Sequence, residues 1–229
     1  MKKKSFAIYI TLLALLMISV PFAPPAHGDD KPYDFAIARL HYDGGGDWYG
    51  DPSSLPNLIA FLRKNAGVDV RPEEVRVKPG DPGLFLYPYL YLTGHGNIRF
   101  SDDDITHLRD YLTHGGFLEA DDNYGMDKSF RREMKRVFPN KDWVELPFDH
   151  PIYHMKYEFP GGPPKIHKHD GLPAQGLGLF HKGRLIVYYT YQTDLGDGWE
   201  DPDVHNDPEW KHEAALKMGT NVILYALTH

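Results

Sequence analysis

Residues 85–97 have the sequence FLYPYLYLTGHGN, in which an aromatic and apolar segment runs directly into a glycine-rich polar turn. An apolar run of this length, bounded by turn residues, is typical of a strand that is buried on both faces. The sequence SDDD at 101–104 has the pattern of a helix start, with a Ser N-cap and acidic residues near the positive end of the helix dipole. The segment therefore predicts a strand, a loop and a helix in succession.

The same succession recurs along the chain. Predicted strands at 35–40 and 116–120 each precede a segment with apolar residues at helical spacing, at 55–62 and 127–138. Further predicted elements are short strands at 68–70 and 75–77, a β-hairpin over 177–190 and a final helix from 207. This alternation predicts an α/β fold, a three-layer sandwich whose mostly parallel sheet lies between two layers of helices.

A functional site is expected in the loops that follow the strands, because ligands of such sheets bind outside the carboxyl ends of the strands. The loops that would meet there are 41–53, 93–100, 121–127 and 191–207. They hold most of the Gly, Asp, His and Asn residues that have no role in the core.

The N-terminus has the pattern of a secretory signal peptide. Three lysines at 2–4 precede an apolar run at 6–20, and prolines and the small-x-small sequence Ala26-His27-Gly28 follow. We therefore expect residues 1–28 to be a signal peptide, residues 29–229 to form a single domain, and the mature protein to be periplasmic or extracellular. The alternative is an uncleaved N-terminal membrane anchor.

Composition excludes several classes of function. The chain has no Cys, which rules out disulfides, thiolate metal sites, a Cys nucleophile and a lipid anchor on cysteine. The formal net charge is −7, and removing residues 1–28 takes away three lysines and no acidic residue, which leaves −10. Such an acidic chain argues against nucleic acid and anionic lipid as partners. The 15 Tyr residues suit stacking on flat ligands such as sugars, or simply a ring-rich core.

Two turns carry the candidate catalytic residues. In the first, His95 lies between Gly94 and Gly96, where it could act as a general base or metal ligand while the glycines let the backbone approach a ligand. The alternative is a tight turn with an exposed histidine. In the second, Asp121 and Asp122 could bind a cation or act as nucleophile or general base, although strand alternation should point them in different directions. The alternative is a set of turn and helix caps.

Candidate ligand-binding residues surround these turns. Asn123 and Tyr124 continue the second turn, and Arg131 on the following helix is close enough to pair with the aspartates. Trp48 in the glycine-rich loop 43–49 could be a stacking platform or a loop anchor. The acidic run 194–207 contributes Asp194 and Trp199; it could bind calcium or be a solvated loop, since EF-hand spacing is absent.

A histidine-rich irregular segment spans 141–176. His154, His167 and His169 are candidate ligands of a divalent metal cofactor, and the last two share one face if the chain is extended there. No diagnostic metal-binding spacing is present, and among 13 histidines some clustering is expected by chance.

Several segments together resemble a known bacterial family. They are 91–96, 115–118, 121–134, 146–152 and 194–200, and they resemble the uncharacterised domain-of-unknown-function family 4159 over residues 33–227. The resemblance implies a fold similar to class I glutamine amidotransferases, which is flavodoxin-like. It does not imply their chemistry, because the turn 121–124 stands where those enzymes carry a nucleophilic Cys, and a thioester glutaminase is therefore excluded.

Two hypotheses of function follow. In the first, the chain is an exported envelope protein, a non-catalytic module that binds a glycan or a partner protein in the cleft at the strand ends. In the second, it is a hydrolase-like enzyme that uses His95 and Asp121 or Asp122, with assistance from a metal.

Overall fold

The computed structural model describes residues 33–229, and residues Tyr33–His229 group into one compact unit. The predicted signal peptide and the alternative membrane anchor lie outside the described residues. Within residues 33–229, no helix combines the length and the apolar character needed to cross a membrane.

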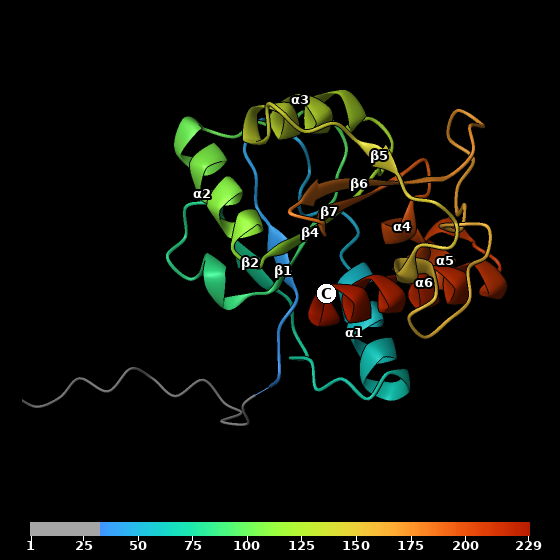
Figure 1. Cartoon of the computed structure of the whole chain (residues 1–229). Helices are drawn as coiled ribbons and strands as arrows, with labels where there is room; N and C mark the ends of the chain where they lie inside the picture. Colours follow the sequence, from blue (N-terminus) through green and yellow to red (C-terminus); the bar gives the residue numbers. More distant parts are fainter. Residues whose placement is uncertain (1–32) are drawn as a thin grey trace, which may run out of the picture. The chain divides into compact units, whose positions relative to one another are not determined.

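A seven-stranded sheet runs through the described residues in the order β2-β1-β3-β4-β7-β6-β5 (Figure 1). Its strands are β1 (Ala38–Leu40), β2 (Val75–Val77), β3 (Tyr89–Leu92), β4 (Phe117–Asp121), β5 (Val144–Glu145), β6 (Gln175–His181) and β7 (Arg184–Tyr191). The neighbours from β2 to β7 pair in parallel, and β6 and β5 extend the sheet as antiparallel strands. The predicted mostly parallel sheet and the predicted hairpin are thus both present.

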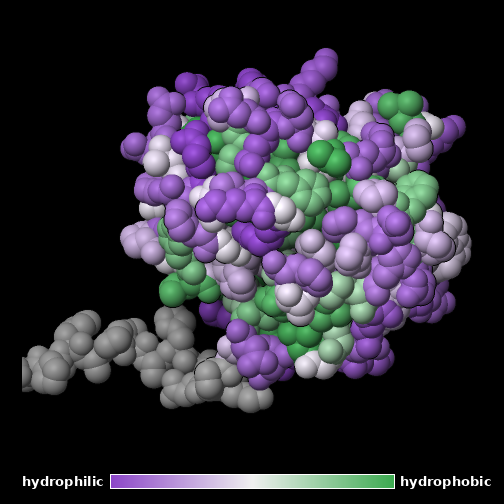
Figure 2. Space-filling view, viewed as in Figure 1, coloured by the Kyte–Doolittle hydropathy of each residue, from purple (hydrophilic) through white to green (hydrophobic). Residues whose placement is uncertain are grey.

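Helices cover both faces of the sheet, which confirms the three-layer α/β sandwich (Figure 1). One face carries α2 (Asp102–Thr113) and α3 (Asp127–Val137), and the other carries α1 (Ser54–Asn65), α4 (Leu195–Trp199) and α6 (Glu209–Thr228). Shorter elements are α5 (Pro202–His205) and the 3-10 turns η1 (Leu84–Leu86) and η2 (Pro151–Tyr153). Figure 2 shows a largely hydrophilic surface over α3, at the top of that view.

Alternation along the central strands produces two separate cores. In β3, Leu90 and Leu92 pack with α2 and α3, whereas Tyr89 and Tyr91 pack with α1 and α6. All four of these side chains are fully buried. The aromatic run therefore serves the fold, and its tyrosines are core residues rather than ligand platforms.

Local details differ from the sequence predictions. The predicted strand over 85–92 begins only at Tyr89, because residues Leu84–Leu86 form the turn η1 and Pro88 has no N–H to donate to a ladder. The capping box at Ser101 is present, with Asp104 N donating to Ser101 Oγ at 3.1 Å. Asp127 does not cap α3; it is the first residue of the helix, where it pairs with Arg131 one turn later at 2.6 Å.

Two buried glutamates on the two sides of the sheet have opposite electrostatic environments. Glu119 in β4 is fully buried and accepts a hydrogen bond from the Tyr89 hydroxyl, and burial raises its pKa to about 8. Burial also acts to raise the pKa of Glu133 in α3. The hydrogen bonds from Arg132, Phe100 N and Arg136 outweigh this effect and lower the pKa below the ordinary value. Only Glu133 has a cationic partner.

We predict that Glu119→Gln reduces the pH dependence of stability. The folded protein holds a proton on Glu119 that the unfolded chain releases from pH 4.5 upward, so the free energy of unfolding falls as pH rises towards about 8. The substitution should remove roughly 2–4 kcal/mol of the decline between pH 5 and pH 9 in urea unfolding. Glu133→Gln is the matched control: it should destabilise at neutral pH, and this loss should disappear on acidification. An unchanged pH profile in Glu119→Gln would contradict the assignment.

Candidate functional site

The loops that follow β1, β3, β4 and β7 meet at the carboxyl edge of the sheet. Asn123 Nδ2 donates to both oxygens of Asp51 at 3.1 Å, which joins the loop after β4 to the loop after β1. The loop after β3 joins the same group, because Gly46 N donates to Asn97 O at 3.0 Å. These contacts bring together most of the residues that the sequence analysis selected.

Asp121 ties β4 to the segment that follows β7. Its carboxylate accepts hydrogen bonds from Thr190 Oγ1 at 2.5 Å, from Thr193 Oγ1 at 3.1 Å and from Gly196 N at 2.6 Å. The side chain is fully buried, and burial raises its pKa to about 7. Both oxygens are occupied by the fold, so the geometry gives Asp121 a positioning role and not the expected catalytic one.

We predict that Asp121→Ala destabilises the protein by roughly 2–4 kcal/mol, because it leaves several buried donors without an acceptor. Urea unfolding monitored by circular dichroism provides the measurement. Asp103→Ala, at an exposed position in the first turn of α2, is the control and should change stability by less than roughly 0.5 kcal/mol. Equal stabilities of the two variants would show that the hydrogen bonds to Asp121 do not stabilise the fold.

Asp122 and Asn123 directly follow Asp121, but their side chains take no part in its carboxylate hydrogen bonds. Both side chains are buried, and within the described part of the chain Asp122 Oδ1 and Asn123 Oδ1 have no hydrogen-bond partner. Burial, followed by the charge of Asp127, raises the pKa of Asp122 to about 6. Unpaired buried oxygens are costly, and their occurrence at a strand end is typical of a ligand site.

A cleft of about 390 Å³ opens beside Asp122. Its lining residues are Asp122, Tyr124, Gly125, Asp127, Lys128, Asp170, Tyr191 and Gln192. The Tyr124 ring stacks on His169 with centroids 4.8 Å apart, and its hydroxyl donates to Asp170 Oδ1 at 2.6 Å. Tyr124 has a left-handed backbone with φ 60°, a conformation that costs free energy in a non-glycine residue and is frequent at functional turns.

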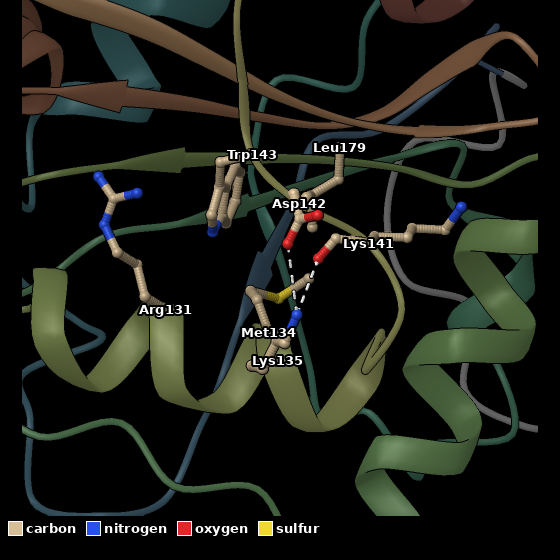
Figure 3. A pocket seen from close by; sticks show the side chains of 7 residues that line it. All are labelled: Arg131, Met134, Lys135, Lys141, Asp142, Trp143 and Leu179. Carbon is tan, nitrogen blue, oxygen red and sulfur yellow. Dashed lines mark hydrogen bonds and ion pairs between the residues drawn. The ribbon is translucent and has the colours of Figure 1, made fainter.

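Arg131 belongs to an aromatic wall next to this cleft. Its guanidinium lies 5.7, 5.4 and 5.2 Å from the ring centroids of Trp143, Tyr189 and Tyr191. Figure 3 shows Arg131 and Trp143 lining a second cleft between α3 and β6, of about 230 Å³. Arg131 is thus held by rings and by Asp127, and within residues 33–229 no ion pair joins it to Asp121 or Asp122, the partners that the sequence suggested.

His95 forms a dyad with Asp47 at the surface. Asp47 accepts from His95 N, and its Oδ2 lies 3.1 Å from His95 Nδ1. The side chain of His95 is 56% exposed, so its ring is open to solvent. Gly94 has φ +132°, and a Cβ there would lie 2.3 Å from the Tyr42 hydroxyl, so this glycine is required by packing. Gly96, with φ +83°, completes the turn.

The two tryptophans selected from the sequence do not face the cleft. Trp48 stacks on His41 with centroids 4.1 Å apart, and Arg76 lies over its ring. Trp199 is fully buried and donates from Nε1 to Ala215 O at 2.8 Å. Trp199 is therefore a core residue of the α4–α6 packing, and Trp48 anchors the loop after β1.

A histidine–carboxylate cluster lies behind the Tyr124–His169 stack. Asp194 Oδ2 is 2.7 Å from His167 Nδ1 and 3.1 Å from His169 Nε2. The hydrogen bonds that His167 makes to Asp194 and then to Asp197 raise its pKa to about 10. Burial alone would raise the pKa of Asp194, but the hydrogen bonds from His167 and His169 hold it below its ordinary value.

The third expected metal ligand, His154, has different partners. Its ring contacts Glu158 Oε2 at 2.5 Å and Phe148 O at 2.8 Å. Neither partner belongs to the histidine cluster, so the structure groups His167 with His169 through Asp194 and leaves His154 apart.

Sequence reasoning missed several members of the site. Asp51, Asp170, Asp197, Glu200 and His205 were not selected, although Asp197, Glu200 and His205 stand in the acidic run that was noted as a whole. That run is solvated only in part: residues 201–206 are exposed, whereas Asp197 contacts His167 and Glu200 is buried near Asp51. The high density of Asp, Glu and His in residues 194–207 was the feature of the sequence that could have identified Asp197, Glu200 and His205.

Fold and site define a class: an α/β three-layer sandwich with a polar, carboxylate-rich site at the carboxyl ends of its parallel strands. The chain belongs to the family described as Domain of unknown function (DUF4159), whose sequence profile matches residues 36–227. No curated protein matches the chain in the comparison with such proteins.

Proposed function

We propose that this chain is a non-catalytic binding module that accommodates a neutral glycan in the cleft beside Asp122. The observation that carries the proposal is Asp122, which lines the cleft and whose buried Oδ1 has no hydrogen-bond partner among residues 33–229. A hydroxyl-rich ligand would donate to such an oxygen and relieve the cost of its burial.

The remaining lining of the cleft suits the same ligand. Tyr124 and Tyr191 offer ring faces for sugar rings, and Asp170 and Gln192 offer planar polar groups for hydroxyls. The carboxylates of the cleft disfavour an anionic ligand by like-charge repulsion. A neutral sugar therefore fits better than a phosphorylated or carboxylated one.

The location and the fold relationship form part of the proposal. We propose that residues 1–28 direct export, which would expose the cleft to envelope glycans or to an envelope protein. The likeness to class I glutamine amidotransferases is supported by the sharp turn after β4, where Tyr124 has positive φ. No Cys occupies that turn, so a glycan-binding role and not glutamine hydrolysis fits the residues.

A hydrolase is the second candidate, and one observation favours it. Asp122 has a pKa raised to about 6 by burial, which would let it give or take a proton near neutral pH. Asp127 supplies a second carboxylate in the same cleft, as glycoside hydrolysis requires. The exposed His95–Asp47 dyad would be a further base.

We predict that Tyr124→Ala weakens glycan binding about 10-fold through the loss of ring stacking. The measurement is isothermal titration calorimetry of the wild-type protein with neutral β-linked N-acetylglucosamine oligosaccharides. Phe148→Ala, which removes a ring of similar exposure that does not line the cleft, is the matched control and should leave affinity unchanged.

The same samples separate the two candidates. Hydrolysis in place of simple binding would be established if the wild type released reducing ends from the oligosaccharides and Asp122→Asn lost this activity but still bound them. Absence of binding to every neutral oligosaccharide tested would contradict both.

A further inference from the structure

Behind the cleft, three side chains from separate segments converge on one point. Nδ1 of His167 lies 3.1 Å from Asp197 Oδ2, and Nε2 of His205 lies 3.5 Å from the same oxygen. One ligand atom from each of His167, Asp197 and His205 lies within 4.8 Å of the others. Two imidazole nitrogens and a carboxylate oxygen form a donor set that suits zinc and other divalent transition metals.

The histidine geometry matches that of a metal ligand. While Nδ1 of His167 faces Asp197, its Nε2 lies 2.9 Å from Asp207 Oδ2. Histidines that bind metals commonly donate their second ring N–H to a carboxylate, which fixes the tautomer and the ring orientation. Glu200 Oε2 lies 2.9 Å from His205 Nε2, the same nitrogen that faces Asp197, so Glu200 is a further carboxylate at the proposed metal position.

Independent support comes from two neighbouring groups. Asp194 Oδ1 is buried and has no hydrogen-bond partner within residues 33–229, while the other oxygen of the same carboxylate contacts His167. A second set, Asp51, Asp197 and Glu200, also places its ligand atoms within 4.8 Å of one another and shares Asp197 with the first. So many carboxylates at one partly buried place favour a cation of charge above one.

We propose that His167, Asp197 and His205 bind a single divalent transition-metal ion, with Asp194 as the adjacent carboxylate that completes the coordination. The alternative for the same residues is a purely structural ion-pair network in which His167 remains a cation. The proposal does not rest on the glycan function. It would, however, place the ion behind the cleft wall, since Asp194 also contacts His169 and His169 stacks under Tyr124.

The test is metal titration of the full-length protein after treatment with EDTA and removal of the chelator. We predict that Zn²⁺ or Mn²⁺ binds with a stoichiometry of a single ion per chain in calorimetry and elemental analysis, and raises the melting temperature. His205→Gln should weaken this binding at least about 10-fold. His154→Gln is the matched control, because it removes another histidine with a carboxylate partner and should leave binding unchanged.

Folding is monitored separately. His205 lies at the surface of the short helix α5, so the metal-free His205→Gln variant should keep the wild-type melting temperature. Co²⁺ added to the wild type gives a second readout, a visible absorption spectrum of nitrogen and oxygen coordination that the variant lacks. The proposal would be overturned if the wild-type protein bound neither Zn²⁺ nor Mn²⁺. It would also be overturned if the wild type and His205→Gln bound the metal with equal affinity.

Discussion

The arrangement of the site depends on the buried carboxylate of Asp121. It stands at the end of the central strand β4 and accepts hydrogen bonds from Thr190, Thr193 and Gly196 N. These bonds fix the path of the chain after β7. Because α4 and the acidic segment follow that path directly, the positions of Asp194, Asp197 and His205 depend on it. Asp121 therefore organises the site without facing a ligand.

Buried charge is distributed unevenly over the molecule, and the distribution locates function. On the α2–α3 side, Glu133 is satisfied by arginines and a backbone donor. At the strand ends, burial raises the pKa of Asp51 to about 8 and of Asp122 to about 6, with further contributions from neighbouring carboxylates. Acids with raised pKa values are enriched at functional sites, although Glu119 and Asp121 show that residues supporting the fold have them as well.

The sequence predicted the layers of the fold well, because apolar periodicity and capping residues are local signals. The strand at Tyr89–Leu92, the capped helix after Ser101 and the hairpin across 181–184 are all present. It predicted the site less well. Trp199 was selected as a ligand-binding residue because nothing local shows that α6 packs over it. The direction of Asp121 depends on its contacts with Thr190 and Gly196, which are distant in sequence. Asp51 and His205 were missed because their partners lie far away in sequence.

The central claim is that the carboxylates and histidines at the strand ends form a ligand site and are not merely caps and ion pairs. Anomalous X-ray diffraction at the zinc absorption edge, from crystals grown with equimolar Zn²⁺, tests it most directly. The account predicts a peak about 2.0–2.2 Å from His167 Nδ1, His205 Nε2 and an oxygen of Asp197. A peak found only at another histidine, such as His154, would contradict it. The absence of any peak at His167, Asp197 and His205 would contradict it as well.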